Sequence, residues 1–420
     1  MISKDQLKQT VKEQREAILQ KPLGIERTIL SHIEKKAKLP HVVVLTGLRR
    51  SGKSTILRQL IKKLYGDEDF YYLNFEDERL FNFQAKDFNM IYEALVELFG
   101  EKRVFFIDEI QNIPLFESFV RRFYDAGFKF FITGSSAKLL SHEIGTKLTG
   151  RHVDITVSPF SFREYLILKG FKFDGGSTFT TNTRARLKRH FSEYLLNGGM
   201  PEYVQFNDPE ILIRVYEDIL IKDIMVRYKV DNHKELKELY QYLVTTVSQK
   251  FSYNSLKKFI KIKSTNTIKK YIDFLEETYF INTINKFDYS LKKQIINDKK
   301  AYVVDNGFIQ KISVKLTKDK GWLLENMVFI SLKSQGNVFY YSGKYECDFL
   351  VLERNTVKSA IQVCWELTRE NKERETNGLI EVMDKFKLKK GLILTNDQEE
   401  EIKVKQKTII VRPVWKWLLE

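Results

Sequence analysis

Short apolar runs alternate with helix-length segments over the first 160 residues. The runs cover residues 42–45, 70–75, 104–107, 130–132 and 153–157. Short buried strands separated by helices are typical of a parallel sheet whose two faces are covered by helices. The pattern therefore predicts an α/β fold, with a core over residues 39–160.

The segments before and after this core show other patterns of apolar and polar residues. Residues 1–38 have helical spacing in two pieces, interrupted at Pro22 and Gly24. Residues 161–250 are predicted to be a helical lid or linker, with a loop at 174–177. Residues 251–310 are lysine-rich and compact, and residues 311–420 return to mixed strands and helices.

The lysine-rich segment predicts a winged helix. Helices are expected at 255–262 and 267–279, with Ile268, Ile272 and Leu275 inside and Lys269 and Lys270 outside, and a hairpin is expected over 280–304. In a winged helix the second helix enters the DNA major groove. Between residues 255 and 300 there are eleven lysines, five acids and no arginine, which predicts phosphate contacts with weak sequence specificity. Alternatively, the segment only packs on the core predicted over residues 39–160 or on a partner.

Length and composition narrow the class. A chain of 420 residues with 43% hydrophobic residues predicts two to four globular domains. It has no apolar stretch long enough for a membrane span and no signal-peptide region at its start, and it contains two cysteines; we therefore expect a cytoplasmic protein without a membrane partner. The net charge of +15 favours DNA or RNA as a partner, although a lysine-rich genome would produce the same surplus.

The first apolar run leads into a phosphate-binding motif. Its residues are Gly47, Leu48, Arg49, Arg50, Ser51, Gly52, Lys53 and Ser54, and Thr55 then opens a segment of helical spacing. A GxxxxGK[ST] loop between a strand and a helix binds a triphosphate through its backbone N–H groups. The lysine reaches the β- and γ-phosphates, and the serine hydroxyl reaches Mg²⁺. A plain glycine-rich turn would not need the lysine and serine at these positions.

The third apolar run ends in two acids, Asp108 and Glu109. A carboxylate at the C-terminal end of a strand beside the phosphate loop predicts a magnesium-supporting acid, which we assign to Asp108. Glu109 would orient and polarise the attacking water, so we expect hydrolysis and not binding alone. In isolation, two acids at a strand end would indicate only a solvated turn.

Two further positions have two interpretations each. Ser135 follows the fourth run, where it would sense the γ-phosphate, or Ser135 or Ser136 would cap the next helix. Arg151 precedes the fifth run, where AAA+ ATPases place an arginine that reaches the γ-phosphate of a neighbouring subunit, which would require a homo-oligomer. The alternative for Arg151 is a surface ion pair.

Together these motifs resemble one family. It comprises the archaeal and bacterial AAA+-type ATPases with a C-terminal restriction-endonuclease-like domain of unknown function. The matching segments are 46–54, 74–77, 106–111, 133–136, 148–151 and 198–202. The resemblance implies ATP as the nucleotide, and Asn74 and Glu76 as residues that line the site from a neighbouring strand.

The C-terminal segment is similar to the PD-(D/E)xK nuclease pattern, but with a damaged site. Glu325 on a helix and Asp348 on a strand are present, while Gln362 stands for the second acid and Cys364 for the lysine. Because a thiol is a poor substitute for a cation, we expect a fold retained for binding or assembly and no cleavage. Lys358, earlier on the same strand, would be the nearest replacement in sequence.

The sequence thus predicts a magnesium-dependent ATPase with a phosphate-loop core, a lid, a winged helix and a nuclease-like tail. One hypothesis is that ATP turnover drives action on DNA or on a DNA–protein complex. The other is a nucleotide-dependent regulatory switch that binds a protein partner.

Overall fold

The computed structural model describes residues 3–135, 148, 150–171, 180–262, 264–313 and 320–420, so the loop expected at 174–177 lies outside the described residues. The chain forms two compact units. The first unit is Met1–Pro159 with Glu277–Tyr279, and the second is Phe160–Glu276 with Phe280–Glu420. The finer division of the second unit into lid, winged helix and tail remains a prediction.

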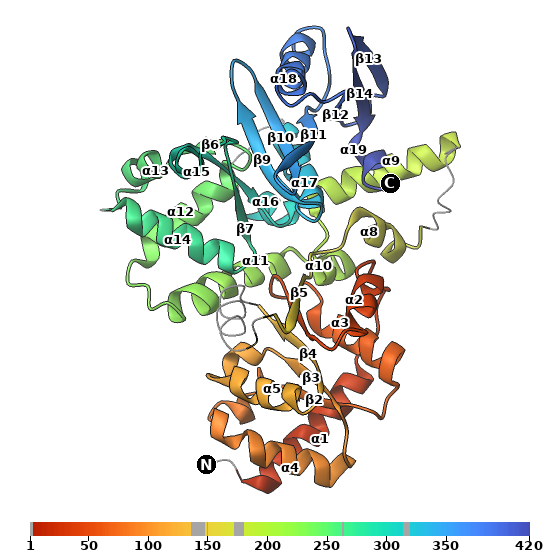
Figure 1. Cartoon of the computed structure of the whole chain (residues 1–420), viewed down its shortest axis with the longest axis vertical. Helices are drawn as coiled ribbons and strands as arrows, with labels where there is room; N and C mark the ends of the chain where they lie inside the picture. Colours follow the sequence, from red (N-terminus) through yellow and green to blue (C-terminus); the bar gives the residue numbers. More distant parts are fainter. Residues whose placement is uncertain (1–2, 136–147, 149, 172–179, 263, 314–319) are drawn as a thin grey trace. The chain divides into compact units, whose positions relative to one another are not determined.

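The first unit alternates strands and helices (Figure 1). Its strands are β1 (Val42–Thr46), β2 (Tyr71–Asn74), β3 (Val104–Asp108), β4 (Lys129–Gly134) and β5 (His152–Thr156). Its helices are α1 (Lys4–Gln20), α2 (Leu30–Ala37), α3 (Lys53–Leu60), α4 (Phe88–Phe99) and α5 (Phe116–Asp125). Ser3 caps α1 in a capping box with Gln6, which explains why this helix starts where it does.

The five strands form a parallel sheet in the order β2-β3-β4-β1-β5. Because every strand runs the same way, the loops after β1, β2, β3 and β4 leave from one edge of the sheet. The expected parallel-sheet α/β fold of a P-loop NTPase is confirmed. All five strands lie where the apolar runs predicted them, within a residue or two at each end.

Helices cover both faces of this sheet. On one face, Val42 and Val44 pack with residues of α4 and α5; on the other, Val43 and Leu45 pack with residues of α2 and α3. The alternation along β1 therefore contributes to two separate cores. Both cores hold this edge of the sheet, and with it the loops that leave it, in a fixed position.

The second unit begins with helices. They are α8 (Phe162–Leu168), α9 (Thr181–Asn197), α10 (Pro201–Phe206), α11 (Pro209–Asp218), α12 (His233–Thr245), α13 (Tyr253–Ile260), α14 (Thr265–Glu277) and α16 (Asn306–Ile312). On α14, Ile268, Ile272 and Leu275 are buried and Lys269 and Lys270 are exposed, as predicted. The order of helices and strands in this segment is compatible with a winged helix, which remains a proposal.

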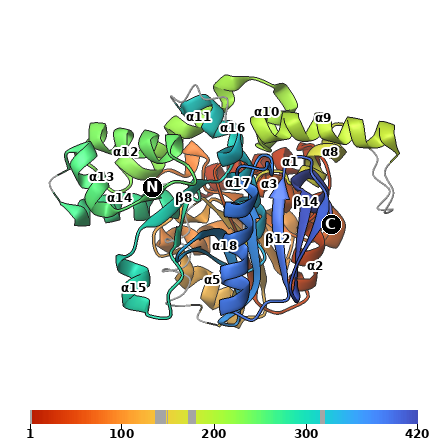
Figure 2. The same ribbon diagram turned by 90° about the horizontal axis from the view of Figure 1, so that it is seen from above.

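Two sheets complete the second unit (Figure 2). A three-stranded sheet has the order β6-β8-β7, from β6 (Lys250–Phe251), β7 (Ile281–Asn285) and β8 (Lys299–Val303), with α15 (Leu291–Ile296) between β7 and β8. A six-stranded sheet has the order β13-β14-β12-β11-β10-β9. Its strands are β9 (Asn337–Ser342), β10 (Glu346–Glu353), β11 (Thr356–Val363), β12 (Lys390–Thr395), β13 (Glu400–Val404) and β14 (Lys407–Pro413).

Helices α17 (Gly321–Leu332), α18 (Lys372–Lys385) and α19 (Val414–Trp417) accompany this six-stranded sheet. Leu379, Val382 and Met383 of α18 pack on the sheet in one apolar core. Within the described part of the chain, no helix is both long and apolar enough to cross a bilayer.

Candidate functional site: a phosphate loop and two acids

The phosphate loop connects β1 to α3 and depends on two glycines. Gly47 has φ +138°, and a Cβ there would lie 2.3 Å from the carbonyl oxygen of Val157. Gly52 has φ +100° and stands directly before the first residue of α3. The positive φ angle disfavours a side chain at both positions, and at Gly47 a side chain would also collide with Val157. The loop therefore delivers the N-terminus of α3 to the sheet edge, where backbone N–H groups favour an anion.

Lys53 is buried inside this loop. Its ammonium donates to the carbonyl oxygens of Gly47 (3.1 Å) and Leu48 (3.0 Å). It also lies 3.8 Å from Glu109 Oε1. The side chain thus folds back on the loop itself, which holds its ammonium at the position where a phosphate would bind.

Asp108 ends β3 and accepts hydrogen bonds from two hydroxyl groups. Thr133 Oγ1 and Tyr72 Oη donate to its two carboxylate oxygens, the second at 3.2 Å, and Ser54 lines the same cavity as Asp108. Burial raises the pKa of Asp108 above its usual value, and the charge of Glu109 adds to the rise. The cavity thus brings together Ser54 and Asp108, the two residues to which we assign the magnesium ion.

Glu109 follows in the left-handed region, with φ 52°. A non-glycine residue in this conformation is strained, and such strain is typical of functional sites. The backbone N–H of Glu109 donates to Thr133 Oγ1 (3.0 Å), while Gln111 Nε2 donates to Glu109 Oε2 (2.5 Å) and to Ser135 Oγ (3.3 Å). Ser135 therefore lies beside Glu109, in a position that suits a phosphate sensor.

The two neighbouring acids have opposite electrostatic environments. Burial acts to raise the pKa of Glu109, but the positive charge of Lys53 and the hydrogen bond from Gln111 outweigh it, so that this pKa lies below the usual value. Glu109 is consequently ionised while Lys53 faces it. A base must be ionised to accept a proton, so the arrangement suits the water-activating role predicted for Glu109.

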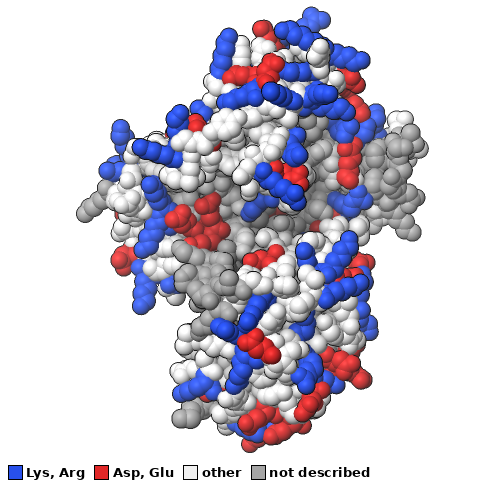
Figure 3. Space-filling view, viewed as in Figure 1, with Lys and Arg blue, Asp and Glu red and all other residues white. Residues whose placement is uncertain are grey.

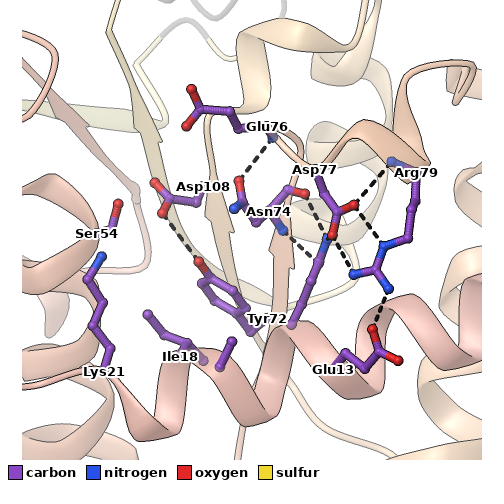
Figure 4. Close-up of a pocket in the computed structure, with 12 residues that line it drawn as sticks. Glu13, Ile18, Lys21, Ser54, Tyr72, Asn74, Glu76, Asp77, Arg79 and Asp108 are labelled. Carbon is purple, nitrogen blue, oxygen red and sulfur yellow. Dashed lines mark hydrogen bonds and ion pairs between the residues drawn. The ribbon is translucent and has the colours of Figure 1, made fainter. Parts of the chain in front are cut away.

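A cavity of about 520 Å³ opens beside Ser54 and Asp108 (Figure 4). Asn74 and Glu76 line this cavity. Lys21, which follows the last residue of α1, extends toward Ser54 and Asp108. The hydroxyl of Ser51, a fully buried residue, has no hydrogen-bond partner within the described residues. A buried hydroxyl without a partner is costly, and a phosphate oxygen at the loop would satisfy it. These residues fit a magnesium–triphosphate complex.

The other predicted loop residues lie around this centre. Arg49 forms an ion pair with Glu76 (2.9 Å), which links the loop to the segment after β2. Arg50 has φ 61°, a second strained position in the loop. Thr55 lies in the first turn of α3, directly after Ser54 in sequence.

Arg151 is distant in sequence from the phosphate loop, and its contacts are with other residues. Its guanidinium is 2.8 Å from Asp125 Oδ1 and packs over the ring of Tyr124, both at the end of α5. This is the surface ion pair that the alternative interpretation expected, and the role of Arg151 toward a neighbouring subunit stays a prediction. Ser136 lies outside the described residues.

Sequence reasoning assigned no role to three residues that build the site. Tyr72 and Thr133 hold Asp108, and Gln111 joins Glu109 to Ser135. Their positions carried a weak signal, since Tyr72 and Thr133 are on strands that carry a motif and Gln111 lies in the turn after β3. Their hydrogen bonds could not be deduced without the packing of the strands.

The acids of the tail form a second cluster, inside the second unit, and its cation is Lys300 of β8. The ammonium of this lysine lies 3.0 Å from Glu346 Oε1, 3.1 Å from Glu325 Oε1 and 3.2 Å from Asp348 Oδ1. Tyr302 donates to the same oxygen of Glu325 (2.8 Å). Despite its burial, Lys300 has a pKa raised well above the usual value by these carboxylates. An ammonium therefore occupies the centre of the acidic cluster.

Lys358, the nearest lysine on the same strand, is not the cation of this cluster. Lys358 is more than half exposed, with its ammonium 4.0 Å from Glu353 Oε2, so it does not reach the cluster. Gln362 uses its amide to bond Glu375 (2.6 Å) and the backbone of Asp348 (3.2 Å). Cys364 is buried, and burial raises the pKa of its thiol to about 12. Lys300 was missed because it lies on a different sheet.

Two family models match separate parts of the chain. The family described as "AAA domain" matches residues 40–166, and "Domain of unknown function (DUF8612)" matches residues 188–319. Fold, motifs and family match define the first unit as an AAA+ ATPase-like P-loop domain.

Full-length relatives identify the family. The chain is 36% identical to "Uncharacterized protein MJ1544" of Methanocaldococcus jannaschii, over 96% of this chain and 97% of that protein. It is 30% identical to an "Uncharacterized protein" of Haemophilus influenzae, over 90% and 94% of the two chains. The chain belongs to the same family as these two proteins.

Among solved structures, domain III of the replication initiation protein DnaA of Thermotoga maritima is similar. It shows 13% identity and a TM-score of 0.28, over 45% of this chain and 82% of that one. The RuvB Holliday junction branch migration motor of Thermotoga maritima shows 15% identity and a TM-score of 0.28, over 65% and 88%.

Proposed function

We propose that this protein is a magnesium-dependent ATPase that couples hydrolysis to action on DNA or on a DNA–protein complex. The observation that carries the ATPase proposal is the meeting of Lys53, Ser54, Asp108 and Glu109 at one edge of a parallel sheet. The preference for ATP over other nucleoside triphosphates follows from the family resemblance.

Each residue has a role that its contacts support. Lys53 binds the β- and γ-phosphates, exchanging the loop carbonyls for phosphate oxygens. Ser54 and Asp108 hold the magnesium ion, which when bound would neutralise charge on the phosphate oxygens. Glu109 orients water and accepts its proton.

Arg151 would act toward the γ-phosphate of a neighbouring copy, which makes a homo-oligomer part of the proposal. To do so, its guanidinium must exchange Asp125 for the phosphate. Both groups of this ion pair are more than a third exposed, and surface ion pairs of this kind are weak. The exchange therefore has a low cost.

DNA contact is assigned to the lysines around α13, α14 and the β7–β8 region. Lys299 and Lys300 are buried and bonded to other groups, so they do not contribute. Lys258, Lys269 and Lys270 are exposed. Over the face in Figure 3, basic side chains are spread among acidic ones. The exposed lysines would contact phosphates and would not read bases.

The test is ATPase activity at low salt with duplex, single-stranded and branched DNA and with RNA. We expect stimulation by at least one DNA form and a steep loss of that stimulation as salt rises, because counterions compete for the same phosphates. The Glu109→Gln variant serves as the blank for contaminating ATPases. Turnover that ignores every nucleic acid would remove DNA from the proposal while leaving the ATPase.

A second candidate function is a regulatory switch that binds a protein partner. The acidic cluster around Lys300 favours it, since a tail whose cluster already holds an ammonium is suited to binding or assembly. This candidate expects a change of assembly state with ATP, measured by size-exclusion chromatography. Identical profiles with and without ATP would count against it.

We propose that the tail does not cleave DNA. Metal-dependent cleavage needs carboxylates that are free to bind the ion, whereas Lys300 contacts Glu325, Glu346 and Asp348 together. The check is incubation of DNA with Mg²⁺ or Mn²⁺, beside an Asp348→Ala variant. Cleavage that disappears in this variant would overturn the proposal.

Both cysteines are free and buried, which fits the expected cytoplasmic location.

A further inference from the structure

Arg27 connects the phosphate loop to the segment through which the chain leaves the first unit. It lies between α1 and α2 and is 5% exposed. Its Nη1 donates to the carbonyl oxygen of Ser51 (3.0 Å), and its Nη2 donates to those of Ser158 (2.6 Å) and Pro159 (3.4 Å). A guanidinium can bridge two chain segments in this way because its donors form a rigid planar fork.

The loop that carries Arg27 is fastened to the helix that follows the phosphate loop. Gln59 of α3 donates to the carbonyl oxygens of Leu23 (2.6 Å) and Ile25 (2.7 Å). A Cβ at Gly52 would lie 3.1 Å from Arg27 Nη1, so the glycine also makes room for the guanidinium. Arg27 is therefore built against the loop and is not a surface group that happens to reach it.

The hydrogen bond from Arg27 to the carbonyl oxygen of Ser51 also affects the N–H of Gly52, which belongs to the same peptide group and lies on its anion-binding side. In a trans peptide the carbonyl of one residue and the N–H of the next point in opposite directions. By holding the Ser51 carbonyl, Arg27 directs the N–H of Gly52 away from itself. Any rotation of this peptide during nucleotide binding changes the hydrogen bond to Arg27.

The chain leaves the first unit through residues 157–160, and hydrogen bonds hold this segment on both sides of the Pro159–Phe160 peptide bond. Pro159 is the last residue of this stretch of the first unit, and Phe160 is the first residue of the second. Within the second unit, Phe160 N donates to Gly199 O (2.7 Å) and Tyr194 Oη donates to Phe160 O (2.7 Å). Gly199 belongs to the Gly-Gly-Met-Pro-Glu motif, so this motif holds Phe160 in place.

We propose that Arg27 is a positioning residue that transmits the nucleotide state of the phosphate loop to residues 157–160. The inference rests on the proposed nucleotide binding. It adds the route by which binding at Ser51 and Gly52 reaches the connection to the second unit. Because Pro159 and Phe160 are adjacent, a shift that Arg27 imposes on one is passed to the other through the backbone.

Hydrogen exchange of the full chain, with and without ATPγS and Mg²⁺, tests this route. In the wild type, ATPγS should slow exchange in peptides that cover residues 157–162. In Arg27→Met at saturating ATPγS, we expect at least half of that change to be lost, with nucleotide affinity reduced by about tenfold or less. Arg15→Met is the matched control, since Arg15 Nη2 also donates to two carbonyl oxygens, those of Asp67 (2.8 Å) and Glu68 (3.2 Å); it should behave as the wild type.

The outcomes separate the inference from the function on which it rests. A wild type that binds no ATPγS would defeat the proposed function itself. A wild type that binds it without any change at 157–162, or an Arg27→Met variant that shows the full change, would overturn the role of Arg27. If Arg27→Met does not fold, Arg27→Lys replaces it: one ammonium cannot hold both segments, so a partial response is expected and a full one would refute the route.

Discussion

Lys53 and Glu109 bring their charged ends to 3.8 Å from each other, although neither is near the other in sequence. Lys53 lowers the pKa of Glu109, against the effect of burial. Before nucleotide binds, Glu109 is thus ionised and paired with the lysine that should hold phosphate. A triphosphate would share the charge of Lys53, and the pKa of Glu109 should then rise toward the range that suits a general base.

Lys53→Ala should lose most of the affinity for nucleotide. The variant removes the charge that meets the β- and γ-phosphates and leaves the loop backbone in place. Titration with a fluorescent ATP analogue measures the loss. Lys62→Ala, which removes a half-exposed lysine from the segment after α3, should bind as the wild type. Undiminished binding by Lys53→Ala would show that the phosphate loop is wrongly assigned.

Glu109→Gln should keep nucleotide binding and slow hydrolysis by roughly 10²-fold or more, the range expected for a positioned general base. Steady-state phosphate release and equilibrium binding measure the two properties separately. Glu76→Gln is the comparison, because Glu76 lines the cavity beside Asp108. Normal turnover in Glu109→Gln, with slow turnover in Glu76→Gln, would transfer the catalytic role to Glu76.

Lys300→Met should destabilise the second unit by about 3–5 kcal/mol, the usual cost of removing one partner from a buried ion pair. The reason is that Glu325 and Asp348 would remain buried without their cation. Urea unfolding measures the change. Lys250→Met is the control: Lys250 pairs with Glu346 from a more exposed position, and its loss should cost about 1 kcal/mol or less. Equal losses would mean that burial of the cluster has no energetic consequence.

The stability of the second unit should fall as pH rises from about 4 to about 7. Burial raises the pKa of Asp305 to about 7, against a usual value of 3.8. Within this window the folded carboxyl keeps a proton that the unfolded one has lost, so raising the pH favours unfolding. The free energy of unfolding, measured in urea at pH 5 and pH 8, should drop less in Asp305→Asn than in the wild type. Equal drops would contradict a proton on Asp305.

Much of the first unit was predictable from local sequence. An apolar run of three to six residues between helix-length segments specifies a buried parallel strand, because both of its faces must pack. Gly47 and Gly52 mark a loop whose backbone excludes side chains, and Asp108 ends a buried strand directly before Glu109. Each of these two signals spans only a few residues, so the local order of residues alone reveals it.

The tail shows where local reasoning fails. The pattern around Gln362 and Cys364 indicated a damaged site, and the search for a replacement cation stayed on the same strand, at Lys358. The cation is Lys300, 48 residues from Asp348 and on a different sheet. No spacing rule connects such positions, since a long side chain can enter from any element that packs nearby.

The sequence by itself determined the strands of the first unit, the phosphate loop and the pair of acids, because these depend on backbone conformation and on the period of buried residues. Only the tertiary structure decided which side chains complete each site: Tyr72 and Thr133 at Asp108, Lys300 among the tail acids, and Arg27 between Ser51 and Ser158. Arg27 and Ser158 are 131 residues apart. Their contact depends on how strands and loops are brought together in space, which the order of residues along the chain does not express.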